Sequence, residues 1–317
     1  MSGEGAELFL EGTNVQGVDT CRRAPTAYAA LLALEPRDDV ADRVLFLACS
    51  GAKIEEIAAQ LARVPGGLGS SERVEMVLLS VGGNDALFGT VGRVCLLPFD
   101  CTEFGRAWLG NLPTLVPQLQ AVYRTVLDAF PGADVYVVPY PSPINRSRAG
   151  CDYSMFSGDE HAFLAAFTAA LDDTVAGAVS GLDEHRLHFV DTMPAALAGS
   201  RLRLCDTPDA GDAGVNLLAA NSVLGSLEQS VFPLNWVHNS LHPNARGHEA
   251  MRAAFLAFLD GVEPAPLDVP EPDLDGTTCQ DLTGKELEAC SWDWAGREAA
   301  GFLLRKGWML VLTRTFQ

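Results

Sequence analysis

Three short segments contain residues that could together carry out acyl transfer. Ser50-Gly51 and Gly83-Asn84-Asp85 each follow an apolar run, and residues 239–244 precede an amphipathic segment. A histidine such as His242 can take a proton from a nucleophile and return it to a leaving group. A glycine N–H and an asparagine amide can donate hydrogen bonds to an oxyanion. Glycine and asparagine are also common in turns, and Asn244 could simply cap a helix, but the three segments together favour a hydrolytic site.

The elements that must position these residues alternate along the chain. Short continuous apolar runs predict buried strands, and amphipathic periodicity predicts helices. The predicted strands cover residues 43–49, 74–81, 133–139 and 187–191, and the predicted helices cover residues 25–34, 54–63, 112–130, 159–179 and 245–258. This alternation is typical of an α/β protein with a three-layer, doubly wound parallel sheet. Ligands bind beyond the carboxyl ends of such strands, where Gly51 and Asn84 are expected to lie.

Composition excludes several kinds of partner. The 317 residues include 41 acidic and 22 basic side chains, for a formal net charge of -19, and 48% are hydrophobic. This is a globular composition, and its acidity argues against nucleic acid and against an anionic membrane surface. No apolar run approaches the roughly 20 residues of a transmembrane helix, so residues 162–171 are interpreted as core. We expect no cofactor and no metal, since His238 and His242 lie in a loop-like segment.

A proline-rich acidic stretch near residue 262 predicts a domain boundary. Residues 1–261 are expected to form the hydrolase-like domain. Residues 262–317 are expected to form an acidic linker and a small disulfide-containing tail, which is too small for a core of its own and could add one strand to the main domain.

The cysteines favour a disulfide-bonded, exported protein. Their number is even, none forms a CxxC pair, and they are scattered along the chain: Cys21, Cys49, Cys95, Cys101, Cys151, Cys205, Cys279 and Cys290. Disulfides persist in oxidising compartments, so these cysteines predict export. Buried free thiols in a cytosolic enzyme are the alternative, because residues 1–7 have neither the basic nor the apolar region of a signal peptide.

Four sequence blocks in this order resemble the SGNH, or GDSL-type, hydrolase family. Gly82-Gly83-Asn84-Asp85 is similar to its G-x-N-D block, and His242-Pro243-Asn244 to its histidine block. Cys49-Ser50-Gly51-Ala52 and residues 21–28 resemble segments of the secreted bacterial esterase and lipase branch. The resemblance implies a flavodoxin-like fold, with His242 as the base and with Gly51 and Asn84 in the oxyanion hole. It also implies the bridges Cys21–Cys49, Cys95–Cys101 and Cys151–Cys205, which leaves Cys279–Cys290 for the tail.

The chain departs from the family pattern at two places. Asn239 stands where the family has an aspartate, so we expect a dyad in which Asn239 helps to orient His242. The resemblance also places the nucleophilic serine, together with the first strand and a signal peptide, upstream of Met1. Ser2, Ser50 and Ser240 are weaker substitutes for the nucleophile. Residues 308–312 are the spare candidate for the first strand if the chain is not truncated.

These observations lead to two functional hypotheses. In the first, the full-length protein is a secreted serine ester hydrolase of the esterase or lipase type, and the printed chain is inactive because it lacks the nucleophile. In the second, the chain is a catalytically inactive SGNH-fold module that binds a glycan, a lipid or a protein partner. Apolar residues near His242, such as Phe232 and Trp236, favour a substrate with an acyl chain. Oligomeric state and chain-length preference are not determined by the sequence.

Overall fold

The sheet at the centre of the molecule is parallel. The computed structural model describes residues 1–6, 8–15, 17–35, 44–64, 74–97, 99–217 and 241–305, with side chains up to residue 299. Within these residues, the sheet has three strands in the order β1 (Met76–Leu79), β2 (Asp134–Val137) and β3 (Leu187–Phe189). Met76 is paired with Asp134, and Val135 with Leu187. Neighbouring parallel strands require crossover connections, and helices provide them here.

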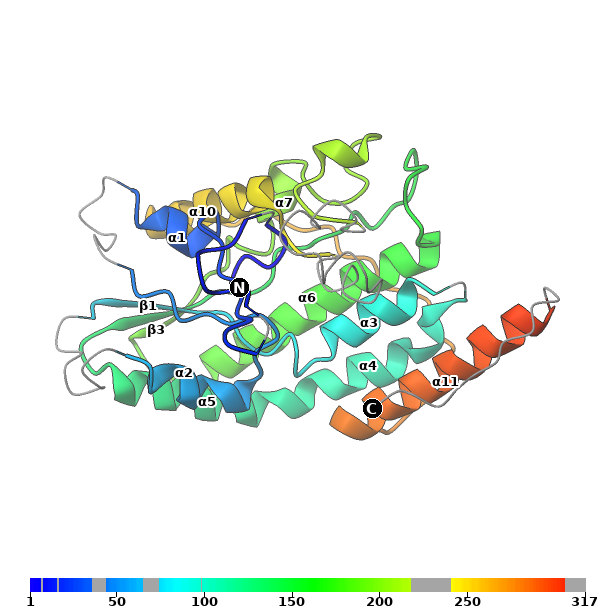
Figure 1. Cartoon of the computed structure of the whole chain (residues 1–317), viewed down its shortest axis with the longest axis horizontal. Helices are drawn as coiled ribbons and strands as arrows, with labels where there is room; N and C mark the ends of the chain where they lie inside the picture. The colour runs from blue at the N-terminus through cyan, green and yellow to red at the C-terminus, as the bar shows by residue number, and fades with distance from the viewer. Residues whose placement is uncertain are drawn as a thin grey trace.

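Helices cover both faces of this sheet, which gives the predicted three layers (Figure 1). One layer contains α2 (Ile57–Leu61), α5 (Val116–Ala129) and α6 (Gly158–Ser180), and the other contains α1 (Tyr28–Leu32), α7 (Ala196–Gly199) and α10 (Ala245–Leu259). The second layer packs Tyr28, Met251 and Phe255 against Val138 beside β2. The fold class predicted from the sequence is therefore confirmed.

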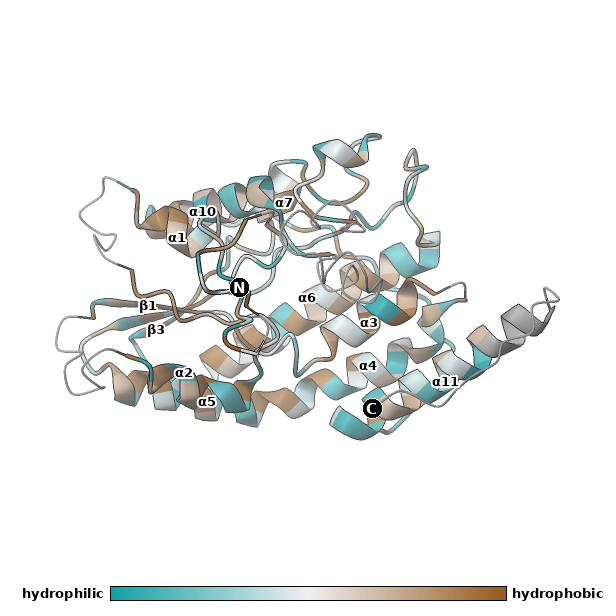
Figure 2. Ribbon diagram, in the orientation of Figure 1, coloured by the Kyte–Doolittle hydropathy of each residue, from teal (hydrophilic) through white to brown (hydrophobic). Residues whose placement is uncertain are grey.

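The two long helices α5 and α6 form because their apolar residues can be buried together. Helix α5 buries Leu119, Val122 and Val126, and hydrophobic and hydrophilic segments alternate along it in Figure 2. Helix α6 begins with a capping box between Ser157 and Glu160. Its 23 residues are long and apolar enough to cross a membrane, but 61% of the most apolar window is buried inside the protein. Helix α6 is therefore packed as a core helix, as the sequence indicates for residues 162–171.

The prediction of a strand at residues 43–49 is wrong for the part that the structure describes. Residues 44–49 run without strand pairing, and a cavity separates them from β1. Among the described residues, β1 is paired only with β2. An apolar run becomes a strand only if a neighbouring strand satisfies its backbone groups, and residues 44–49 have no such neighbour. Residues 308–312 lie outside the described part of the chain.

The described chain ends in a long helix, α11 (Gly284–Arg305). This helix packs on α3 (Phe88–Cys95) and α4 (Gly105–Asn111). The Trp294 ring lies edge-on to Phe99 and Phe104, with ring centroids 5.0 and 4.8 Å apart. Trp108 Nε1 donates to Ser291 Oγ at 3.2 Å, and both residues are fully buried. The tail thus joins the main core as a helix, while the domain boundary near residue 262 stays a prediction.

All of the cysteines are paired in disulfides. The bridges are Cys21–Cys49, Cys95–Cys101, Cys151–Cys205 and Cys279–Cys290. This is the pairing that the family resemblance implies. Such bridges are typical of exported proteins and stabilise the fold mainly by restricting the unfolded chain.

Candidate active site

One large cavity brings the predicted site residues together. It has a volume of about 1380 Å³, lies between β1 and residues 44–49, and continues past the carboxyl end of β1. Gly51, Asn84 and His242 all line it, although they are far apart in the sequence. This is the edge of a parallel sheet at which ligands usually bind. The structure thus places the three residues around one space, and their catalytic roles remain predictions.

Tyr140 positions the turn that carries Asn84. The Gly83 N–H donates to the Tyr140 hydroxyl at 2.9 Å, and a Cβ at Gly83 would lie only 2.7 Å from that oxygen. Burial raises the pKa of Tyr140, so the hydroxyl stays neutral. The Asn84 amide itself is exposed to the cavity, and its Nδ2 donates to Ala52 O at 2.9 Å. The bond from Asn84 to Ala52 therefore connects the turn that carries Asn84 with the segment that carries Gly51.

Gly51 lies in a backbone conformation that favours glycine. Its φ is +74°, and a Cβ built on it would meet no atom within 4 Å, so a substrate could approach the backbone closely. The Asp85 carboxylate accepts the Ile54 N–H at 3.1 Å and so ties the Gly51 loop to the end of β1. Burial raises the pKa of Asp85 above its ordinary value. Asp85 therefore acts as a local hydrogen-bonding residue in this structure.

Asn216 fixes the loop that carries His242. The Leu241 N–H donates to Asn216 O at 2.8 Å, and the Asn216 N–H donates to His242 O at 3.1 Å. The Asn216 side chain donates to Gly5 O at 2.8 Å, which joins the N-terminal segment to the same loop. Leu241 has a positive φ of 61°, which is unfavourable for a branched side chain and is maintained here by these bonds. Sequence reasoning missed Asn216 because it lies in an irregular stretch without a motif.

A buried carboxylate lies beside the His242 ring. Glu4 Oε2 is 3.6 Å from His242 Nε2, and Glu4 Oε1 is 2.5 Å from Arg22 Nη1. The Glu4 side chain is 8% exposed, while that of His242 is 35% exposed. Sequence reasoning did not assign Glu4 a role. The available signal was its position between Gly3 and Gly5, since flanking glycines allow the backbone to approach other elements closely.

His248, which lies close to His242 in the sequence, is not an alternative base. His248 is 1% exposed, and its Nδ1 accepts the Tyr28 N–H at 3.3 Å. Burial, with smaller contributions from the Met1 amino group and His242, lowers the pKa of His248 to about 3. His248 is therefore a neutral core residue. His238, Asn239 and Ser240 lie outside the described residues, so their predicted roles stay predictions.

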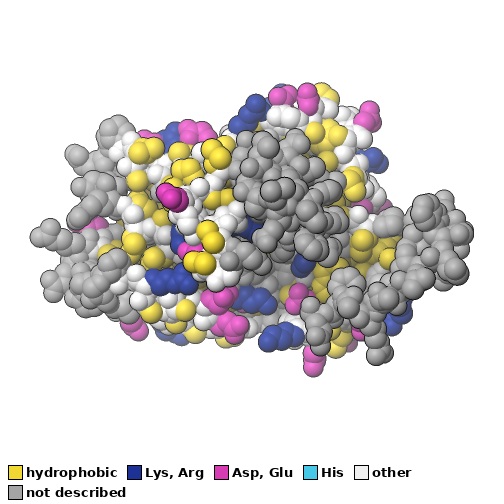
Figure 3. Space-filling model, viewed as in Figure 1, with side chains coloured by type: hydrophobic (Ala, Val, Ile, Leu, Met, Phe, Trp, Pro, Cys, Tyr) yellow, Lys and Arg dark blue, Asp and Glu magenta, His cyan; other side chains and the backbone are white. Residues whose placement is uncertain are grey.

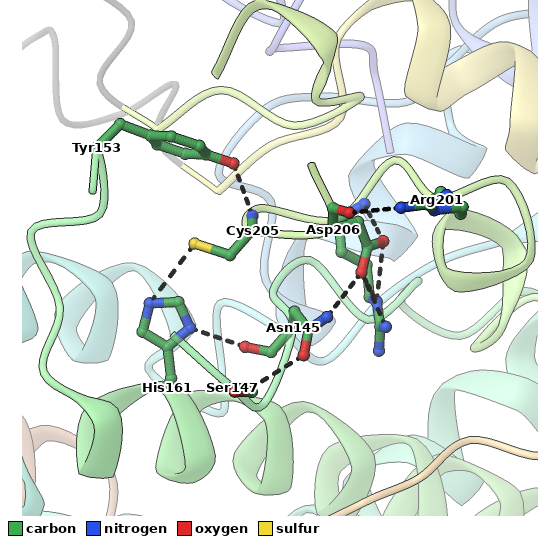
Figure 4. A network of polar contacts seen from close by, with 8 residues as sticks. Asn145, Ser147, Tyr153, His161, Arg201, Cys205 and Asp206 are labelled. Carbon is green, nitrogen blue, oxygen red and sulfur yellow. Dashed lines mark hydrogen bonds and ion pairs between the residues drawn. The ribbon is translucent and has the colours of Figure 1, made fainter. Parts of the chain in front are cut away.

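A second serine–histidine pair is structural. His161 is fully buried, and its Nε2 lies 2.7 Å from Ser154 Oγ. Its Nδ1 lies 2.7 Å from Asn145 O, as Figure 4 shows. Burial lowers the pKa of His161, so the ring is neutral: Nδ1–H donates to the carbonyl, and Nε2 accepts from the hydroxyl. Ser154 Oγ in turn accepts the Phe156 N–H at 3.3 Å. Neither Ser154 nor His161 lines the large cavity, so this pair holds a loop in place.

Among the described residues, potential metal ligands give no plausible metal site. In the described part of the chain, one group has metal-like spacing, Cys95, Cys101 and Glu160. Its two cysteines are joined in a disulfide, so they offer no thiolate to a metal. On the face shown in Figure 3, acidic and basic side chains are interspersed among apolar ones.

The fold and the cavity define the class of this protein as an α/β protein with a large cavity at the carboxyl end of its parallel strands. The chain belongs to the GDSL-like lipase/acylhydrolase family, whose model matches residues 9–250. This confirms the family predicted from the sequence blocks.

Three relatives are informative. The chain is 31% identical over 144 residues to Lipase 1 of Streptomyces coelicolor, an alignment that covers 44% of this chain and 48%, about half, of that protein. Its fold is similar to that of phospholipase A1 from Streptomyces albidoflavus, with a TM-score of 0.63, 24% identity, and coverage of 83% of this chain and 94% of that one. The extracellular lipase of Streptomyces rimosus matches with a TM-score of 0.61, 25% identity, and coverage of 83% and 95%.

Proposed function

We propose that the chain provides the general base and two oxyanion donors of a secreted serine ester hydrolase. The observation that carries this proposal is that Gly51, Asn84 and His242 line one cavity at the end of β1. A serine hydroxyl is a weak nucleophile until a base takes its proton, and His242 would do this. His242 would then give that proton to the leaving alcohol. The Gly51 N–H and the Asn84 amide would donate to the tetrahedral oxyanion, where each donor typically contributes about 3 kcal/mol.

We infer that the nucleophilic serine precedes Met1 and is carried on a strand. The shape of the cavity supports this, because it lies between residues 44–49 and the edge of β1 at which no strand is paired among the described residues. Val44 and Leu45 are 42% and 52% exposed, which is unusual for adjacent apolar residues beside a parallel sheet. A strand in this space would cover them, pair with β1 and end next to Gly51 and Asn84. Ser2 fits the role less well because it is only 4% exposed.

We propose a lipid ester as the substrate. The cavity is lined by apolar side chains beside the site, including Leu87, Phe88 and Leu241, which would suit an acyl chain. The names of the relatives, which include two lipases and a phospholipase A1, point to the same substrate class. Secretion is supported by the four disulfides and by the relative described as extracellular.

The test compares the printed chain with one extended by the residues encoded upstream of Met1. The extended protein should react with a fluorophosphonate probe and hydrolyse short p-nitrophenyl esters, and its His242→Ala variant should do neither at a comparable rate. The printed chain should show no activity above background. Fluorophosphonate labelling of the printed chain would place the nucleophile inside it, and an inactive, folded extended chain would contradict the hydrolase proposal.

An inactive binding module is the second candidate. It is favoured by one observation, that Ser2, one of the substitutes for the nucleophile, is only 4% exposed. Such a module would bind lipid vesicles or glycans while failing to hydrolyse any ester, including in the extended form. Vesicle co-sedimentation of the inactive extended chain would support this candidate.

A further inference from the structure

We propose that Glu4 is the positioning residue of the site, whose carboxylate orients His242 and stabilises its protonated form. The proposal rests on the general-base role of His242 in the proposed function. It is motivated by the distance of 3.6 Å between Glu4 Oε2 and His242 Nε2. That distance suits an ion pair rather than a hydrogen bond, so the carboxylate acts on the imidazole through its charge.

The backbone around Glu4 is anchored on both sides. The Ala24 N–H donates to Ser2 O at 2.9 Å, and a Cβ at Gly3 would lie 2.6 Å from the Ala24 Cβ. On the other side, Gly5 O accepts from the Asn216 side chain. The backbone of Glu4 is therefore held in one place between these anchors. Little backbone conformational entropy is lost when the Glu4 carboxylate pairs with His242.

Arg22 makes a buried carboxylate at this position possible. Its guanidinium lies 2.5 Å from Glu4 Oε1, and a buried charge needs such a partner to remain ionised. Arg22 has a positive φ of 50° and follows Cys21, whose disulfide to Cys49 fixes this loop beside the cavity. Arg22 thus keeps Glu4 ionised. Its positive charge also offsets part of the attraction between Glu4 and His242.

Among the described residues, charged and titratable groups from three elements lie near His242. Glu4 belongs to the N-terminal segment, Arg22 lies behind it, and His248 is on α10, where it is influenced by both His242 and the Met1 amino group. His248 is held neutral by burial, so it adds no charge at neutral pH. Glu4 is therefore the acidic member of this set. It can supply the negative charge that the amide of Asn239 cannot, which would account for the family aspartate being replaced by asparagine.

Carbethoxylation tests the proposal without relying on esterase activity. Diethyl pyrocarbonate modifies neutral imidazole, so the pH at which His242 reacts at half its maximal rate reports its protonation. Peptide mass spectrometry follows His242, which is 35% exposed, and uses His185, which is 88% exposed, as an internal reference. We expect Glu4→Gln to lower the midpoint for His242 by about one pH unit and to leave that of His185 unchanged.

Two further variants separate charge from structure. Arg22→Gln should lower the His242 midpoint as Glu4→Gln does, because Glu4 loses the partner that keeps it ionised, whereas Glu55→Gln, at an exposed carboxylate, should leave it unchanged. A purely structural role for Glu4 would alter the maximal rate without moving the midpoint, and an unchanged midpoint in folded Glu4→Gln overturns the proposal. If Glu4→Gln does not fold, Glu4→Asp decides the question, since a retracted carboxylate should give an intermediate midpoint.

The same variants in the extended chain connect this inference to catalysis. There, Glu4→Gln should move the acid limb of the kcat/KM profile to lower pH and reduce kcat about tenfold or more, with little change in KM. Glu4→Asp should restore part of the activity. If the extended chain hydrolyses no ester, the proposed function fails, while the carbethoxylation result still decides whether Glu4 acts on His242.

Discussion

Gly5 packs against the backbone of Pro243 so closely that a side chain has no room between them. A Cβ built on Gly5 would lie 2.3 Å from Pro243 O and 2.9 Å from the carbonyl oxygen of His242. The N-terminal segment and the histidine loop are therefore in direct contact at the point where His242 enters the cavity. Any group larger than hydrogen at Gly5 must move one of them.

Gly5→Ala should displace the His242 loop. We expect a loss of about 1–3 kcal/mol in the free energy of unfolding, the usual range for an overpacked site. In the extended chain, ester hydrolysis should fall more than the binding of substrate. Urea denaturation and steady-state kinetics check the two effects. Gly110→Ala in α4 is the matched control, because its Cβ meets nothing within 4 Å. It should leave hydrolysis unchanged and raise stability by up to about 1 kcal/mol, since alanine favours a helix more than glycine does.

Asn84→Ala should remove one oxyanion donor from the cavity. In the extended chain, we expect kcat to fall about a hundredfold or more with little change in KM, because the lost interaction forms mainly in the transition state. Stability should change little, since the bond from Asn84 to Ala52 O is exposed. A KM effect without a kcat effect would mean that Asn84 binds substrate rather than the oxyanion.

Tyr140→Phe should weaken the turn that carries Asn84. The variant leaves the buried Gly83 N–H without its 2.9 Å acceptor, which typically costs about 1–3 kcal/mol. Esterase activity of the extended chain should fall as well. Tyr153→Phe is the matched control, since the Tyr153 hydroxyl accepts the Cys205 N–H at 2.7 Å in the loop of Figure 4. It should lower stability without lowering activity, and equal losses of activity would contradict a specific role for Tyr140.

The buried histidines should make the fold sensitive to acid. The pKa of His248 is lowered to about 3, and that of His161 is also lowered, both mainly by burial. Because the unfolded chain takes up protons near pH 6.5 and the folded chain does not, their stabilising contribution is present above that pH. This contribution to the free energy of unfolding is lost as the pH falls below 6.5, by up to about 1.4 kcal/mol per pH unit for each histidine. The measurement is the free energy of unfolding in urea from pH 7 to pH 4.

A variant can isolate the contribution of His161. His161→Gln should show a shallower decline in stability below pH 6.5, whereas His185→Gln, at an exposed position, should decline like the original protein. Buried carboxyl groups such as Asp172, whose pKa burial raises well above its ordinary value, act in the opposite direction and cancel in this comparison. An unchanged slope in His161→Gln would contradict the assignment of a neutral ring.

Trp294→Ala should loosen α11 from the core. Its ring packs between Phe99 and Phe104, so we expect a loss of about 3 kcal/mol in the free energy of unfolding. Trp292→Ala on the same helix is the control, because that ring is exposed and contacts only the Arg93 guanidinium among the described aromatic and cation pairs. Limited proteolysis should release α11 earlier from Trp294→Ala than from Trp292→Ala.

The sequence predicts the elements whose signal is local. The apolar run at 74–81 contains β1, the periodic segment at 112–130 contains α5, and the segment at 245–258 covers α10 except for its last residue. Burial of one face suffices to specify each of them. The run at 43–49 has the same local signal, but its described part, residues 44–49, does not form a strand, because strand formation depends on a neighbour that the local sequence does not contain.

The residues of the candidate site likewise fall into some that the local sequence predicts and others that it does not. Gly51, Asn84 and His242 could be predicted because turn residues at strand ends have recognisable types and order. Glu4, Asn216 and Tyr140 could not be predicted, because each acts through a contact between segments remote in the sequence, such as the 211-residue separation between Gly5 and Asn216. Only the folded chain shows which carboxylate, amide or hydroxyl meets these turns.

The order of the disulfides has a consequence for how the chain matures. Each cysteine is bonded to the next one along the sequence, at separations of 28, 6, 54 and 11 residues. Eight cysteines allow about 105 pairings, but a chain that emerges from its N-terminal end presents each partner before a competing thiol arrives. Vectorial emergence alone would then select the native set. Oxidation of the fully unfolded, reduced chain, by contrast, should yield scrambled isomers that need thiol exchange to resolve.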